Sequence, residues 1–265
     1  MSATNLTNPA ERNDASLSYH WTHILWPSLL IVIAWSIMLF AASTNQMYLL
    51  DHDYLLRASH LPWLLALVAF LASWQIMTAA MMLPSTLSMI SIIAYAGRQQ
   101  RHSWLMQVVF IAGYAAVWTV FALVTFVGDT LVHQLVNSWF WLYTHSWLLA
   151  VVILAIAGGS QFSPLKKHCL QQCSRPFSFC ERHYRYGIGS AWYLGWRYGW
   201  SCLGSCWALM LIMFGIGVRS PLWMAMLAGV ILLEKEVPGG QRLRSVIGVA
   251  FLLLGFLWLV FHLWY

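Results

Sequence analysis

The sequence predicts an all-α protein, a polytopic bundle of about seven transmembrane helices. Only 8% of its 265 residues are charged and 60% are hydrophobic, whereas a soluble domain carries about 25% charged residues. The mean hydropathy is +0.67, and apolar stretches long enough to cross a bilayer recur along the chain. These observations exclude a soluble enzyme, a disulfide-stabilised secreted domain and a disordered protein.

The polar segment 1–19 is expected to form a flexible tail, which leaves residues 20–265 as a single transmembrane domain. The first apolar run, residues 24–43, would make a helix about 30 Å long, which matches the hydrocarbon core of a bilayer. Further spans are predicted near residues 61–83, 104–127, 139–159, 200–218, 221–237 and 245–264.

The distribution of basic residues predicts the orientation of these spans. If every run crosses the membrane, only Arg57 and Arg219 of the 14 Lys and Arg lie on the side opposite the N-terminus. Without the short sixth crossing, Lys235, Arg242 and Arg244 would move to that side as well. Because basic residues concentrate on the cytosolic side, the pattern favours seven crossings in a bacterial inner membrane, with a cytosolic N-terminus.

One long segment, residues 160–198, is left between spans and is predicted to be a cytosolic loop. Its second half, from His183 to Tyr198, interleaves aromatic side chains with arginines, as segments at the membrane interface do. This aromatic segment either anchors the following helix at the lipid headgroups or covers whatever that helix carries.

Four of the five cysteines form two pairs with the same spacing, Cys169 with Cys173 and Cys202 with Cys206. On a helix, residues four apart lie on one face, so each pair would present both thiols together. The odd number of cysteines excludes a fully paired disulfide framework. The predicted topology also places all five near the reducing face of the membrane, where thiols stay free as metal ligands.

Methionines extend this soft donor set. Met77 and Met81 are four residues apart near the cytosolic end of the second span, just before Pro84, and Met210 and Met213 continue the stripe that begins at Cys202. Thiolate and thioether ligands together favour Cu(I), with Zn(II) as the second choice. The predicted metal ligands are Cys169, Cys173, Cys202, Cys206, Met77 and Met81.

Three alternatives to this copper site remain. The thiols and methionines can be ordinary buried packing. The four cysteines can form a structural zinc site in a membrane scaffold. The chain can be an oxidoreductase or electron-transfer subunit that uses the thiols or a haem, for which only His145 and His262 come near a suitable depth.

The remaining polar residues suggest little further chemistry. His52, His60, His133, Asp51 and Asp53 fall near the predicted outer face with no spacing that ties them together. Glu234, Lys235 and Glu236, at the inner end of the sixth span, are expected to be solvated by lipid headgroups. No catalytic motif is evident, and the small supply of basic residues argues against a nucleic-acid partner.

Four stretches of the sequence resemble the bacterial "predicted metal-binding integral membrane protein" family, which is known only as a domain of unknown function. They are residues 74–84 with Ala-Met-Met-Leu-Pro, 161–176 with the first cysteine pair, 199–210 with the second pair, and 233–240 with Leu-Glu-Lys-Glu-Val-Pro-Gly-Gly. The resemblance implies a multi-pass inner-membrane protein with a metal site on these cysteines and methionines. Ser205 stands where family members often have a further cysteine.

These observations together predict an inner-membrane protein that binds Cu(I) and either traffics it or delivers it to a partner. That partner would be a metallochaperone or a metalloenzyme, and the lipid bilayer is the other partner of the chain.

Overall fold

The computed structural model describes residues 9–44, 62–97, 103–145, 147–185, 187–216, 220–237 and 240–264, and these ranges contain helices but no strands. The prediction of an all-α helical membrane bundle is therefore confirmed. The elements are α1 (Pro9–Ser43), α2 (Trp63–Met82), the 3-10 turn η3 (Pro84–Thr86), α3 (Leu87–Ala96), α4 (Ser103–Ser138), α5 (Phe140–Thr144), α6 (Trp147–Ser160), α7 (Pro164–Cys173), α8 (Pro176–His183), α9 (Ile188–Ile216), α10 (Pro221–Glu236) and α11 (Gly240–Trp264).

Four helices of the described chain are long and apolar enough to cross a membrane, within α1, α2, α4 and α11. A fifth crossing arises if α6 and α7, which meet at an angle of 64°, are counted as one broken span. Their outer faces carry exposed Leu, Val and Phe side chains, as lipid-facing surfaces do. The number of seven crossings stays a prediction.

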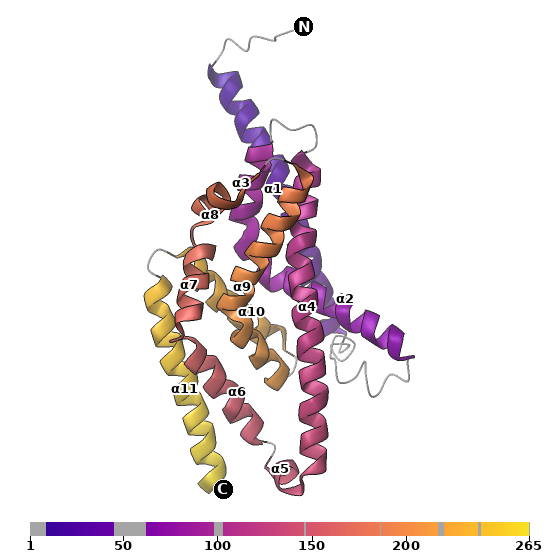
Figure 1. Ribbon diagram of the computed structural model, residues 1–265, viewed down its shortest axis with the longest axis vertical. Coiled ribbons are helices and arrows are strands. Elements are labelled where there is room, and N and C mark those ends of the chain that lie inside the picture. Colours follow the sequence, from indigo (N-terminus) through magenta and orange to yellow (C-terminus); the bar gives the residue numbers. More distant parts are fainter. Residues whose placement is uncertain are drawn as a thin grey trace.

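The helices are arranged around a long central pair (Figure 1). α4 runs through most of the length of the molecule and packs along α9, while α6 packs against α11. The start of α1 and the end of α11 lie at opposite ends of the molecule (Figure 1). The shorter helices α3, α7 and α8 pack around one half of this frame.

Several boundaries differ from the expected ones. α1 begins at Pro9, so part of the polar segment 1–19 is helical, while residues 1–8 lie outside the described part of the chain. The span expected at residues 139–159 consists of α5 and α6. The segment 160–198 is largely helical, because it contains α7, α8 and the first turns of α9. From Ile188 onward the aromatic segment is thus part of the helix that carries Cys202.

Local sequence explains the start of α7, which lies in the segment predicted to be a loop. Ser163 is the N-cap and its hydroxyl accepts a hydrogen bond from the Leu165 backbone N–H, while Pro164 takes the first helical position. Pro84 has the opposite effect on the other side of the site, where α2 stops and the chain turns through η3 into α3. The start of α7 thus precedes the first cysteine pair, and the end of α2 falls at Met82.

Candidate metal centre

The five cysteines are all free and buried. Cys202 and Cys206, on α9, are 0% and 2% exposed. Cys169 and Cys173 are buried on α7, which packs against α9. The two pairs therefore lie on neighbouring helices, although the sequence placed the first of them in a loop.

A glycine allows α7 to approach α9 at the thiols. A Cβ atom added at Gly204 would lie 2.5 Å from Cys169 Sγ, so only glycine leaves room for this sulfur against the α9 backbone. Cys169 and Cys173 both lie within electrostatic range of the Cys202 thiol. Gly204 thus brings the two cysteine pairs together.

Cys202 is the thiol with the most polar surroundings. Tyr114 Oη, from α4, lies 3.0 Å from Cys202 Sγ, and Lys235 Nζ, from α10, lies 2.9 Å from the same sulfur. A buried ammonium donates a strong hydrogen bond to an anionic sulfur and stabilises its negative charge. The helices α4, α9 and α10 therefore meet at one sulfur atom.

Cys206 connects this cluster to the end of α2. Its thiol donates to the Cys202 carbonyl at 2.9 Å, as i to i+4 spacing permits, and is also within hydrogen-bonding reach of the Cys202 sulfur. The same Sγ lies 3.7 Å from Met82 Sδ. Two thiols and one thioether thus meet in the core.

Met82 is not among the predicted ligands, since the i to i+4 spacing favoured Met77 and Met81. Both of those residues are buried in the same core cluster, as are Met210 and Met213 on α9. On α2, it is Met82 that contacts a cysteine, Cys206. The signal in the sequence was its position as the last helical residue before Leu83 and Pro84.

Lys235 was also missed, and the expectation that headgroups solvate it is wrong. Glu234 and Lys235 are 3% and 4% exposed, whereas Glu236 is exposed. Lys166 Nζ, from α7, forms an ion pair of 2.8 Å with Glu234 Oε2, and Lys235 Nζ donates to Ser85 Oγ at 3.3 Å. The end of α10 is enclosed because α7 and η3 pack against it.

Ser205 occupies the position where the resembling family often has cysteine. Its hydroxyl donates to the Cys202 carbonyl at 2.7 Å and lies within hydrogen-bonding reach of Cys173. Within the described residues, no three His, Cys, Asp or Glu side chains converge closely enough to hold a metal ion. The donors that do converge, Cys202, Cys206 and Met82, are soft and few in number, and such a set suits Cu(I).

The other metal-binding candidates are separate from this cluster. Burial raises the pKa of the Cys180 thiol, on α8, which keeps it in the neutral form. The rings of His145 and His262 both pack against Trp147, at centroid distances of 6.3 and 5.0 Å. His52, His60, Asp51 and Asp53 lie outside the described residues, as does the side chain of His133.

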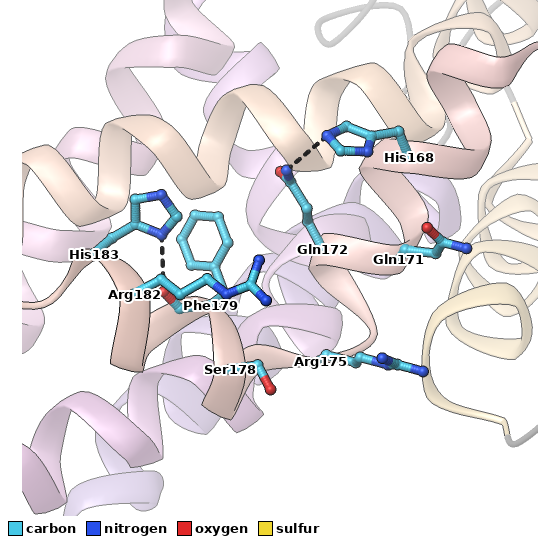
Figure 2. Close-up of a pocket in the computed structure, with 8 residues that line it drawn as sticks. All are labelled: His168, Gln171, Gln172, Arg175, Ser178, Phe179, Arg182 and His183. Atoms are coloured by element: carbon cyan, nitrogen blue, oxygen red, sulfur yellow. Dashed lines mark hydrogen bonds between the residues drawn. The ribbon is translucent and has the colours of Figure 1, made fainter.

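A polar pocket of about 280 Å³ is lined by residues of α7 and α8 (Figure 2). Gln172 Nε2 donates to His168 Nε2 at 3.0 Å, and its Oε1 accepts from Ser201 Oγ at 2.5 Å. Because Ser201 precedes Cys202, Gln172 joins the pocket wall to the buried site. Two arginines and two histidines give the pocket a basic lining, which comprises His168, Gln171, Gln172, Arg175, Ser178, Phe179, Arg182 and His183.

Comparison with known proteins bears on the same part of the chain. A family model described as PpoB2, copper chaperone, matches residues 71–258. The match runs from α2 into α11 and includes all five cysteines, Met82 and Lys235. No curated protein and no solved structure matches the chain. Because the matched residues make up well over half of the sequence, the chain belongs to the PpoB2 family of copper chaperones.

Proposed function

We propose that this protein is a copper chaperone of the bacterial inner membrane that holds Cu(I) between Cys202 and Cys206, with a methionine thioether as a further ligand. The observation that carries the proposal is the meeting of two thiols and Met82 Sδ in a buried core. Two thiolates and a thioether give Cu(I) the low coordination number and soft ligands that it prefers.

The other predicted ligands have supporting roles in this proposal. Cys169 and Cys173 lie on α7, which packs against the helix that carries Cys202, and would accept the ion as it moves into or out of the site. Met77 and Met81 lie in the same buried core and would provide alternative thioethers during that movement. The recipient would be a metallochaperone or a metalloenzyme.

A direct test is the copper content of purified protein. Wild-type protein in detergent, loaded with Cu(I) under reducing conditions and desalted, is expected to retain about one copper per chain. The double variant Cys202→Ser, Cys206→Ser removes both thiolates and is expected to retain almost none, whereas Cys180→Ser is expected to match wild type. Equal and near-zero copper in all three proteins would refute the proposal.

A second prediction concerns the thioether. Met82→Leu keeps the volume of the side chain but removes the sulfur, so we expect the affinity for Cu(I) to fall about tenfold while the affinity for Zn(II) is unchanged. Competition with a Cu(I)-specific chromophoric chelator measures the first affinity and a zinc indicator the second.

The matched controls are Met81→Leu and Met226→Leu, the latter on an exposed face of α10. We expect a smaller loss of Cu(I) affinity for Met81→Leu and none for Met226→Leu. A Met82→Leu protein with wild-type Cu(I) affinity would show that this sulfur does not bind the ion.

A further inference from the structure

The buried charges near the thiols do not balance. Lys166, Glu234 and Lys235 are the charged residues that are buried in the described part of the chain. Lys166 and Glu234 form an ion pair and cancel each other. Among these same residues no ion pair joins Lys235 to a carboxylate, and its ammonium contacts Cys202 Sγ and Ser85 Oγ. The positive charge of Lys235 therefore lies against the sulfur cluster without a paired carboxylate among these residues.

This ammonium is held in place by the turn that follows Met82. Ser85 Oγ donates to the Met82 carbonyl at 2.9 Å and accepts from Lys235 Nζ at 3.3 Å. The second contact, to Cys202 Sγ at 2.9 Å, places the charge directly beside a proposed ligand. Lys235 is thus fixed between the residue that provides the thioether and the residue that provides the first thiolate.

We infer that Lys235 is a specificity-determining residue that selects a monovalent over a divalent metal ion, an inference that rests on the proposed function. Metal-bound cysteines are thiolates, so Cys202 and Cys206 together contribute two negative charges. One Cu(I) ion and one ammonium neutralise them. With Zn(II) in the same place, the sum is one positive charge in a core from which water is excluded, and an uncompensated buried charge is unfavourable.

The test compares affinities for two metals in three proteins. Wild type, Lys235→Met and Lys167→Met are purified in detergent, and the ratio of the Cu(I) to the Zn(II) association constant is measured by competition with chelators. Removal of the ammonium leaves the copper complex negative and makes the zinc complex neutral, so the ratio is expected to fall about tenfold or more in Lys235→Met. Lys167 is exposed, and its substitution is expected to leave the ratio unchanged.

Two further variants distinguish an effect of the Lys235 charge from an effect of misfolding. Ser85→Asp places a carboxylate against the ammonium and is expected to lower the ratio in the same direction, while Lys235→Arg keeps the charge and is expected to keep the ratio. An unchanged ratio in folded Lys235→Met overturns the inference. If that variant does not fold, an unchanged ratio in Ser85→Asp, or a lowered one in Lys235→Arg, overturns it.

The outcomes distinguish this inference from the proposed function. Wild-type protein that binds no Cu(I) refutes the proposed function and the inference with it. Wild-type protein that binds Cu(I), together with variants that keep its metal selectivity, refutes the inference alone.

Discussion

Replacing Glu234 by glutamine is expected to lower the free energy of unfolding by about 3–5 kcal/mol, because it leaves a buried ammonium without its counter-charge. The Lys166 and Glu234 side chains are 4% and 2% exposed, and their charged atoms lie 2.8 Å apart. Lys166 Nζ has no other hydrogen-bond acceptor among the described residues. This pair connects α7 to α10, so its loss would also loosen the cover of the thiol cluster.

Unfolding by a denaturing detergent in mixed micelles, followed by circular dichroism, measures this effect. Glu236→Gln is the matched control, since Glu236 is exposed on the same helix and accepts a long hydrogen bond of 3.5 Å from Ser88 Oγ. The double variant Lys166→Met, Glu234→Leu removes both charges and is expected to recover most of the lost stability. Equal stability of Glu234→Gln and Glu236→Gln would contradict the prediction.

Gly195→Ala is expected to separate α4 from α9 and to destabilise the fold by about 1–3 kcal/mol or more. A Cβ atom at Gly195 would lie 2.1 Å from the Phe110 carbonyl oxygen, and one at Gly113 would lie 2.6 Å from that of Trp192. Both contacts are with the backbone of the facing helix, which cannot move aside as a flexible side chain can. Small residues at such crossings allow membrane helices to pack closely.

The effect of Gly195→Ala should reach the metal centre. Tyr114 follows Gly113 on α4 and contacts Cys202 on α9, so a wider spacing would break that hydrogen bond. We expect Gly195→Ala to lose copper as well as stability, measured by copper content and by detergent unfolding. Gly189→Ala on the same helix has nothing within 4 Å of the added atom and is expected to be neutral or stabilising. A Gly189→Ala protein as unstable as Gly195→Ala would refute this explanation.

The helical class of the fold and the shared face of Cys202 and Cys206 follow from local patterns. Length and apolarity of a run are properties of a single helix, so the spans within α1, α2 and α11 could be predicted within a few residues. The start of the span within α4 was also predicted, but this span continues to Val136, beyond the expected end at residue 127. The i to i+4 spacing likewise predicted that Cys202 and Cys206 share a face. Each of these conclusions depends only on the sequence of a single helix.

The parts that could not be predicted depend on pairs of helices. Whether Lys235 meets headgroups or a thiol depends on how far α7 and η3 cover the end of α10, and no local pattern encodes that. The choice between Met81 and Met82 depends on how α2 meets α9, and both residues are buried. Ser163 and Pro164 did carry a local signal for the start of α7, but the segment 160–198 was assigned to a loop because it lies between the predicted spans.

The deep burial of Cys202 and Cys206 has a kinetic consequence. Cargo between these thiols would be out of direct reach of water and glutathione, because Cys202 and Cys206 are 0% and 2% exposed. A recipient protein could not exchange ligands with it directly either. The rate of release would therefore be set by how often α7 and α10 move away from α9, and the lifetime of the loaded state would measure helix motion instead of metal–sulfur bond strength.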